Sequence, residues 1–353
     1  MKILLVQDRL RGGGTERQTV FLARSFAARD HAVSLLTFRP GGALAGDLAG
    51  TGATHRALQP FDTGLDWFAP QLDAVARAFA PDVVLCMGRM ANCRGGQLQR
   101  ALPSAAVVAT VRTGKSLPWL YRRSLRTVRA VVTNSEFAQR TLVAAAGAAD
   151  RCTVIANALL YAGLLTLEPA PTEPPVILNV AQFRRGKGHA ALLAACAALP
   201  RDLAWRLEFV GDGPERAGCE RAAVQAGIAD RVVFHGWQKH PTDFYRRASI
   251  AALASQPGFE SLPNFLVEAQ CACLPVVACD TDGVAETFRD QETGLLVPAG
   301  DATQFTAALA VLLSQPARRG SMAAAARAWA RTQFDPAQQV EAYLALFARL
   351  RSS

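Results

Sequence analysis

Two glutamates eight positions apart, Glu260 and Glu268, are the side chains best spaced for chemistry in this chain. They lie in the stretch GFESLPNFLVEA, where Pro263-Asn264 indicates a helix start, since proline is well tolerated at the first helical position. A helix start presents unpaired N–H groups and suits a phosphate, whereas a buried carboxylate such as Glu268 needs polar partners. The stretch alone fits equally well a capped core helix that carries one partly exposed glutamate.

A basic loop, AQFRRGKGH at 181–189, supplies complementary charge. Arg184 and Arg185 offer bidentate forks to a phosphate, and Lys187 offers a compact charge. The loop follows a predicted parallel strand, and ligands of such sheets bind at the strands' carboxyl ends. We therefore favour a phosphate site here over a merely solvated basic loop.

A glycine-rich turn, RLRGGGTERQ at 10–19, follows the first predicted strand. It matches neither a GxGxxG dinucleotide fingerprint nor a Walker A loop. It is consistent with close approach of the backbone to a ligand, or with an ordinary strand–helix turn.

The elements that must position these residues form an α/β pattern that occurs twice. Short apolar strands alternate with helical segments, which is typical of doubly wound parallel sheets. The predicted strands are 2–7, 32–38, 82–87, 105–111, 130–134, 176–181, 206–210, 231–234, 250–254, 275–278 and 295–297. The proline-rich stretch at 167–175 predicts a linker between domains 1–166 and 176–333, with a ligand cleft between them. Asp335-Pro336 opens a final helix within 334–353, which we expect to pack back on the N-terminal domain.

In this order, several motifs resemble the GT4 family of retaining glycosyltransferases, which have the GT-B fold. They are GGTE (13–16), KG (187–188), GDGP (211–214), GFESLPNFLVEA (258–269), LPVVACD (274–280) and TGLLVPAGD (293–301). The resemblance covers nearly the whole chain, and the EX7E pattern is its strongest element. It implies two Rossmann-like domains that face each other across a cleft.

The resemblance also implies roles for individual residues. Glu268 would hold the ribose hydroxyls of a nucleotide-sugar donor, while Glu260 would lie beside the sugar. The diphosphate would meet the helix start and the basic loop, with Glu260, Lys187 and Arg184 as the catalytic group. The implied donor site comprises Gly13, Gly14, Arg184, Lys187, Gly211, His235, Gly236, Gly258, Phe259, Glu260, Ser261, Leu262, Pro263, Asn264 and Glu268.

Several positions depart from the family's pattern. Gln182 stands where an arginine is usual, so that Arg184 is offset by two residues. Arg112 stands where a histidine often follows the fourth strand, and we expect it at the acceptor side or N-domain cleft. Cys273 replaces a common glycine, and Asn157-Ala-Leu-Leu lacks the usual aspartate.

The implied reaction moves a sugar from a nucleoside-diphosphate sugar to a glycan or lipid-linked acceptor, in bacterial surface polysaccharide or glycolipid assembly. No cofactor and no metal are expected, although Asp280-Thr-Asp282 spells a DxD motif that binds metal in another glycosyltransferase fold. Two alternatives remain: a non-catalytic nucleotide-binding or partner protein, and a sugar-nucleotide epimerase on the same scaffold.

The net charge and the cysteine content limit the classes of partner and the cellular location that the sequence allows. The net charge of +9 fits an acidic partner, but no aromatic RNA-binding signature or basic tail supports nucleic acid. Eight cysteines without a CxxC pair indicate a reducing, cytoplasmic setting, and no apolar run has the length of a membrane span. Residues 112–129 carry six basic residues and no acid, which predicts either contact with an anionic membrane or phosphate-bearing acceptor, or a solvated helix. Apart from His235, the histidines are expected at the surface.

Overall fold

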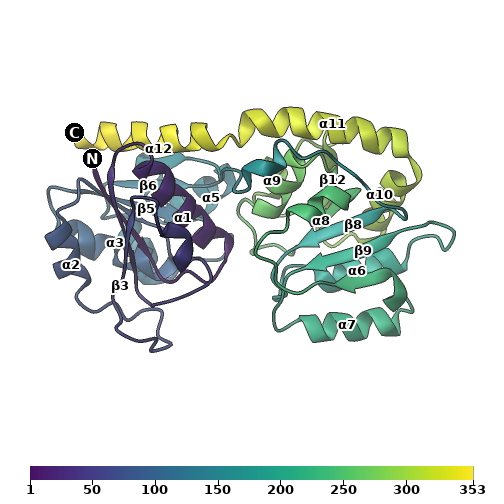
Figure 1. Cartoon of the computed structure of the whole chain (residues 1–353), viewed down its shortest axis with the longest axis horizontal. Coiled ribbons are helices and arrows are strands. Elements are labelled where there is room, and N and C mark those ends of the chain that lie inside the picture. The colour runs from purple at the N-terminus through teal and green to yellow at the C-terminus, as the bar shows by residue number, and fades with distance from the viewer. Residues whose placement is uncertain (353) are drawn as a thin grey trace. The chain divides into compact units, whose positions relative to one another are not determined.

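The computed structural model describes residues 1–352, which fold as two compact units (Figure 1). The first unit contains residues 1–112, 116–160 and 336–352, and the second contains residues 113–115 and 161–335. The chain therefore enters the second unit at Tyr161, before the proline-rich stretch predicted as a linker. The stretch lies along the second unit because its backbone pairs there: Ala170 and Thr172 donate to the carbonyls of Arg246 and Arg247.

A parallel sheet in the order β3-β2-β1-β4-β5-β6-β7 forms the centre of the first unit. Its continuous Val, Leu and Ile runs suit strands that are buried on both faces. The strands are β1 (Lys2–Gln7), β2 (Ala32–Thr37), β3 (Thr54–Ala57), β4 (Val83–Cys86), β5 (Ala106–Val111), β6 (Ala130–Thr133) and β7 (Cys152–Val154).

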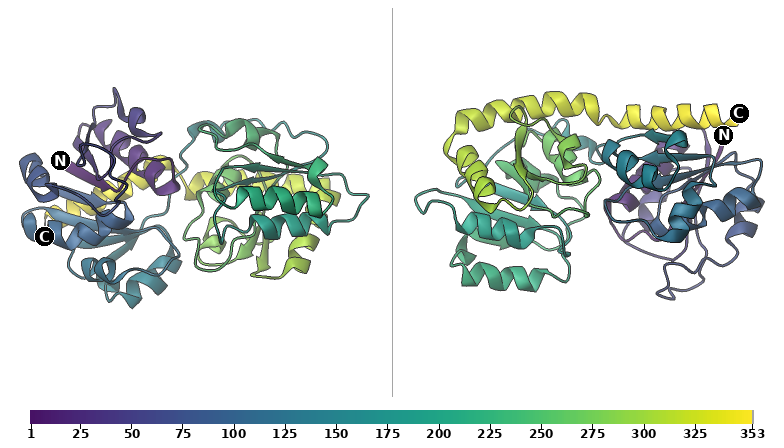
Figure 2. Two further views of the ribbon diagram at one scale, coloured as in Figure 1. Left: turned by 90° about the horizontal axis from the view of Figure 1, so that it is seen from below. Right: turned by 180° about the vertical axis from the view of Figure 1, so that it is seen from behind.

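Helices cover both faces of this sheet (Figure 2). One face packs on α1 (Gly14–Ala27) and α12 (Pro336–Arg351), through a core that includes Phe26, Tyr343 and Phe347. The other face packs on α2 (Leu72–Phe79), α3 (Arg89–Ala101) and α4 (Trp119–Leu125). A short helix, α5 (Glu136–Ala138), follows β6.

The second unit repeats this arrangement with the order β10-β9-β8-β11-β12-β13. Its strands are β8 (Val176–Val180), β9 (Arg206–Val210), β10 (Val232–Phe234), β11 (Ile250–Leu253), β12 (Val276–Asp280) and β13 (Gly294–Pro298). Helices α6 (His189–Ala197), α7 (Arg216–Gln225) and α10 (Ala302–Ser314) share one core with one face of the sheet. Helices α8 (Thr242–Arg247), α9 (Asn264–Cys271) and α11 (Pro316–Gln333) pack on the rest of the unit.

These two parallel sheets confirm the predicted α/β class, and each predicted strand has a counterpart. The prediction missed β3 and β7, which are short strands at the two edges of the first sheet. Both are only partly buried, so neither shows the continuous apolar run that marks the central strands. Within residues 1–352, none of the helices combines the length and apolar content needed to cross a bilayer.

Candidate active site

The strand order of the second unit reverses between β8 and β11. From β8 the chain continues to β9 on one side, whereas from β11 it continues to β12 on the other. Ligands of open α/β sheets bind at such a switch point, beyond the carboxyl ends of the strands. The basic loop follows β8, and the stretch that carries Glu260 follows β11. Topology therefore brings these two sequence motifs together.

Two glycines let the basic loop approach the loop after β11. Gly186 has φ +86°, and a Cβ atom there would lie 2.3 Å from the ring of Phe259. Gly188 has φ +75°, and a Cβ atom there would lie 1.9 Å from the carbonyl oxygen of Ala254. The amide of Gln256 also donates to the carbonyl of Gly186 at 2.8 Å. Only glycine satisfies both the positive φ and the close contact at these two positions.

Lys187 and Glu260 form an ion pair across the two loops. The Nζ atom of Lys187 lies 2.8 Å from Oε1 of Glu260, and the hydroxyl of Ser255 donates to the same oxygen at 2.7 Å. The Glu260 side chain is 6% exposed, whereas that of Lys187 is 27% exposed. The carboxylate is therefore buried with its charge compensated, while the ammonium still reaches solvent.

Asp282 holds the backbone of the loop that carries Glu260. Its carboxylate accepts hydrogen bonds from the amides of Gly258, Phe259 and Glu260 at 2.9–3.0 Å. Asp282 follows β12 and has φ +50°, a conformation that aspartate tolerates better than most residues. Asp282, the second acid of the DxD sequence, therefore has hydrogen-bond partners within the protein.

Helix α9 begins at Asn264, directly after Pro263, so the proline precedes the helix rather than taking its first position. Glu268 lies in the second turn and is buried, with 6% exposure. Its Oε2 accepts a hydrogen bond from the hydroxyl of Tyr245, a fully buried side chain on α8. Ser261 and Leu262, on the loop before the helix, are also buried.

The turns after β9 and β10 meet the basic loop from the other side. The amide of Gly211 donates to the carbonyl of Gly236 at 2.8 Å. The amide of Phe183 donates to the carbonyl of Asp212 at 3.0 Å. His235 contacts a buried carboxylate: its Nε2 lies 2.9 Å from Oε2 of Glu208. The backbone of Gly236, which belongs to the implied donor site, is thus held by the turn at Gly211.

The same Glu208 oxygen also receives a hydrogen bond from Nη2 of Arg247 at 2.6 Å. Arg247 stacks over the ring of Phe244, which lies 4.6 Å from the ring of His235. His235 is therefore oriented by an acid, a guanidinium and an aromatic ring together.

His189 corrects an expectation, since it is buried rather than at the surface. Its ring stacks on the ring of Phe183, with 4.0 Å between the ring centroids, and the residue is the first of α6. Burial lowers the pKa of His189 to about 4, with the nearby charge of Lys187 acting in the same direction. The residue is thus a neutral core group next to the basic loop.

Arg184 accepts the amide hydrogen bond of Lys187 through its carbonyl at 3.1 Å, but its side chain is not part of the Lys187–Glu260 ion pair. It is exposed, and its guanidinium makes no hydrogen bond within the described residues. The remaining predicted positions lie in the first unit. The amide of Gly13 donates to Glu16 at 2.9 Å, and Gly14 begins α1. Arg112 donates to Asn157 and, at 2.6 Å, to the hydroxyl of Tyr343.

The structure divides the basic residues of 112–129 among different roles. Arg112 is engaged with Asn157 and α12, and Lys115 lies over the ring of Phe259 at 5.4 Å. Arg122 and Arg126 donate to the carbonyls of residues 145 and 146. Arg123 instead stacks on Trp119 at 5.4 Å. Arg122, Arg123, Arg126 and Arg129 are all exposed, whereas Arg112 is half-buried.

Sequence reasoning missed the residues that support the predicted ones: Ser255, Asp282, Tyr245, Glu208 and Arg247. Each lies on a different strand end or helix from its partner, except Ser255, which is five residues from Glu260. An acid within the apolar strand that contains Glu208 was the one visible signal, because a buried charge requires a partner.

Two family descriptions match most of the chain. Residues 12–159 match glycosyltransferase family 4, and residues 168–329 match glycosyl transferases group 1. Among curated proteins, LpsE of Rhizobium meliloti, a lipopolysaccharide core biosynthesis glycosyltransferase, is 32% identical over 178 residues, which is 50% of this chain and 51% of LpsE. A diphospho-undecaprenol 4-alpha-N-acetylgalactosaminyltransferase of Campylobacter jejuni is 31% identical over 150 residues, 42% of this chain and 40% of that enzyme. The chain thus matches about half or less of the length of these relatives.

Solved structures share the fold over the full length. HepE of Anabaena in complex with UDP superposes with a TM-score of 0.82 at 20% identity, covering 99% of this chain and 100% of HepE. A further HepE structure contains UDP-glucose. At this level of identity the likeness establishes the fold.

Proposed function

Since this chain belongs to the GT4-like glycosyltransferases of the GT-B fold, we propose that it transfers a sugar from a nucleoside-diphosphate sugar to a glycan or lipid-linked acceptor. The relatives named for lipopolysaccharide core biosynthesis support an acceptor of the bacterial cell surface. The donor class is supported by the HepE complexes with UDP and UDP-glucose.

The observation that carries the proposal is the Lys187–Glu260 pair at the switch point of the second unit. Lys187 has three N–H donors, and one of them goes to Glu260. The other two are available to a phosphate oxygen, and the start of α9 adds the positive end of the helix dipole. Charge that develops on a departing diphosphate is stabilised by such preorganised donors. Glu268, in the second turn of α9, supplies a carboxylate that accepts hydrogen bonds from a vicinal diol such as a ribose.

We extend the proposal to retention of the anomeric configuration, as in the GT4 family. In this account the acceptor attacks on the face from which the diphosphate departs, and a phosphate oxygen takes the acceptor proton. Glu260 lies beside the sugar without acting as the nucleophile, because its carboxylate is already held by Lys187 and Ser255.

A panel of nucleoside diphosphates and nucleoside-diphosphate sugars, read by thermal shift and then by turnover, tests the proposal. A bound donor raises the melting temperature, with about 2.7 kcal/mol of stabilisation at 100 times its dissociation constant. A transferase consumes donor and acceptor together. A non-catalytic binder would show the shift without turnover, and an epimerase would convert the donor with no acceptor present. No shift with any nucleotide would contradict the donor proposal.

The acceptor and the location form a separate part of the proposal. We place the protein at the cytoplasmic face of a membrane, where a lipid-linked acceptor would be met. The basic segment 112–129 supports contact with anionic lipid, because Arg122, Arg123, Arg126 and Arg129 are exposed. Binding to anionic vesicles should weaken at high salt, because screening shortens the reach of the attraction.

A further inference from the structure

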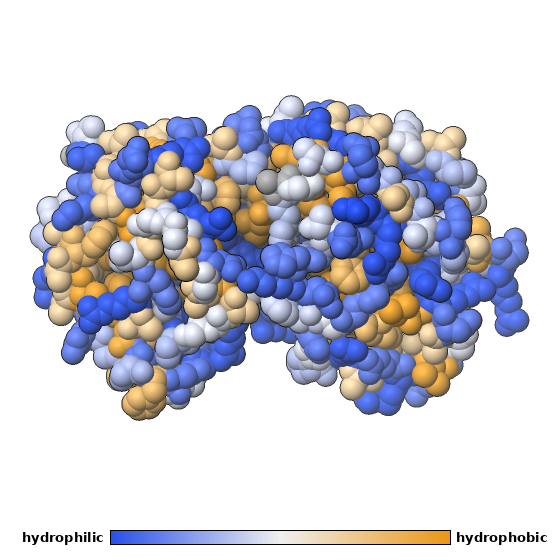
Figure 3. Space-filling model, viewed as in Figure 1, coloured by the Kyte–Doolittle hydropathy of each residue, from blue (hydrophilic) through white to orange (hydrophobic). Residues whose placement is uncertain are grey.

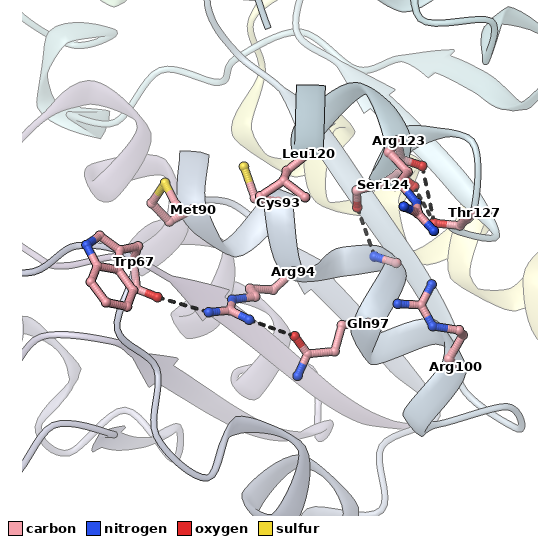
Figure 4. Close-up of a pocket in the computed structure, with 11 residues that line it drawn as sticks. Trp67, Met90, Cys93, Arg94, Gln97, Arg100, Leu120, Arg123, Ser124 and Thr127 are labelled. Atoms are coloured by element: carbon pink, nitrogen blue, oxygen red, sulfur yellow. Dashed lines mark hydrogen bonds between the residues drawn. The ribbon is translucent and has the colours of Figure 1, made fainter. Parts of the chain in front are cut away.

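A groove of about 470 Å³ lies between α3 and α4 in the first unit (Figure 4). Helix α3 approaches α4 closely because it carries Gly96 at the contact, whose amide donates to the hydroxyl of Ser124 at 2.9 Å. The groove is lined by Arg94, Arg100 and Arg123, together with the apolar Trp67, Met90 and Leu120. It is therefore both cationic and apolar.

The charge of the groove has one sign. No Asp or Glu is among the described residues that line it, and Asp73, which Gln97 contacts, is not a lining residue. Arg94 is fixed by hydrogen bonds to Gln97 at 3.0 Å and to the carbonyl of Trp67 at 3.2 Å. The guanidinium groups of Arg100 and Arg123 make no hydrogen bond within residues 1–352, so their planar forks are open to an anionic ligand.

The two segments that contribute Trp67 and Leu120 to the groove carry most of the exposed large apolar side chains. Of the eight large hydrophobic residues that are exposed among residues 1–352, six belong to 61–68 and 119–120: Phe61, Leu65, Trp67, Phe68, Trp119 and Leu120. Trp119 and Leu120 are 67% and 53% exposed at the start of α4. Figure 3 shows apolar patches interspersed with hydrophilic ones on this unit. Scattered exposed residues are common, but a cluster beside a cationic groove marks an interaction surface.

This combination fits a lipid bilayer better than a soluble acid. Tryptophan concentrates at the level of lipid headgroups, where its ring is partly apolar and partly hydrated. Arginine binds phosphate with two parallel hydrogen bonds. A soluble phosphorylated ligand would use the arginines but would leave Trp119 and Leu120 exposed to water.

We propose that the α3–α4 groove binds the phosphate headgroup of an anionic phospholipid, with Trp119 and Leu120 inserted into the bilayer interface beside it. The inference rests on the proposed membrane contact and assigns it to specific residues. Arg100 and Arg123 bind the phosphate, while Arg94 is held in place by Gln97 and Trp67.

Vesicle co-sedimentation without donor or acceptor tests this site. The protein is mixed with vesicles of phosphatidylcholine alone, or of phosphatidylcholine with phosphatidylglycerol. The variant R100Q/R123Q is compared with R24Q/R56Q, which removes the same charge from exposed arginines of α1 and β3. A third variant, W119A/L120A, removes the apolar contacts. Melting temperatures verify that each variant is folded.

We expect wild type and R24Q/R56Q to bind phosphatidylglycerol vesicles, and R100Q/R123Q to bind roughly 25-fold more weakly, at about fivefold for each arginine near the surface. W119A/L120A should also weaken binding. Equal losses in the two arginine variants would show attraction by net charge alone and overturn the groove assignment. Unchanged binding of W119A/L120A would overturn the insertion, and an absence of wild-type binding would overturn the whole site. A further variant, K187A, should lose sugar transfer but still bind vesicles. The vesicle measurements are therefore independent of the proposed transferase activity.

Discussion

Lys187 and Glu260, 73 residues apart in sequence, meet at 2.8 Å between the loops that leave β8 and β11. Their contact gives each residue two tasks. Lys187 neutralises a buried carboxylate and still offers donors to a phosphate, while Glu260 positions the ammonium and lies beside the sugar in the proposed complex. Changes at either residue should therefore affect the other.

Lys187→Ala should lower turnover by about 100- to 1000-fold, because loss of one preorganised donor at a developing anion costs about 2.7–4 kcal/mol. Arg201→Ala is the matched control, since Arg201 is an exposed cation outside the basic loop. Adding Glu260→Ala to Lys187→Ala should cost less than the sum of the single changes, because the two side chains are in contact. Steady-state rates of the four variants measure this, and K187A within about threefold of wild type would contradict the role.

The two glutamates of the EX7E pattern should fail differently. Glu268→Ala should weaken binding of the free nucleoside diphosphate, since charge-assisted hydrogen bonds contribute roughly 1.5–3 kcal/mol each. Tyr245→Phe should weaken it less, because it removes a hydrogen bond to Glu268 and leaves the carboxylate. Glu260→Ala should leave that affinity nearly unchanged but lower turnover. Calorimetric titration decides between these roles, and equal loss of affinity in E260A and E268A would refute them.

Asp282→Ala should reduce turnover while preserving the affinity for the nucleoside diphosphate. The change leaves the amides of Gly258, Phe259 and Glu260 without their acceptor, so the loop no longer holds Glu260 in one position. Asp280→Ala is the matched control, because Asp280 is an exposed acid two residues away. A kcat that falls in D282A and is restored in part by added formate would support this positioning role. Equal effects of the two variants on kcat would count against it.

Stability should fall as the pH is lowered from about 6.5 to about 4, because His189 stays neutral in the fold while the unfolded chain takes up a proton. The two pKa values, 6.5 unfolded and about 4 folded, correspond to a loss of about 3 kcal/mol once the pH is below both. His189→Phe retains stacking on Phe183 and should flatten this dependence. Urea unfolding of both proteins at several pH values measures it, and parallel curves would exclude His189 as the cause.

Central strands and the site loops were predictable from the sequence, because buried parallel strands read as continuous apolar runs and glycine turns follow them. The edge strand β3, with the sequence THRA, carries no such signal. The Lys187 and Glu260 loops could be brought together only by the strand order, which a resemblance to a known family supplies and periodicity does not.

The residues that hold the site side chains in place were less predictable, because their contacts join distant parts of the sequence. Asp282 and Tyr245 contact their partners over 22 or more residues of sequence. The DxD spacing of Asp282 is a metal-binding pattern and gave no indication of a loop contact, and Tyr245 belongs to none of the motifs. His189 was expected at the surface because one polar residue beside a basic loop suggests solvent. Its burial depends on the ring of Phe183, a contact that follows from the turn between them rather than from residue type.

Helix α12 has a consequence for how the protein is made. It completes the core of the first unit, where Tyr343 and Phe347 pack edge-on against Phe26. Strands β1 to β7 are synthesised first, but residues 336–351, which cover one face of their sheet, are synthesised last. Residues 161–335 are synthesised before that helix. The second unit can therefore complete its core before translation ends, whereas the first unit completes its core only after its last helix has been synthesised.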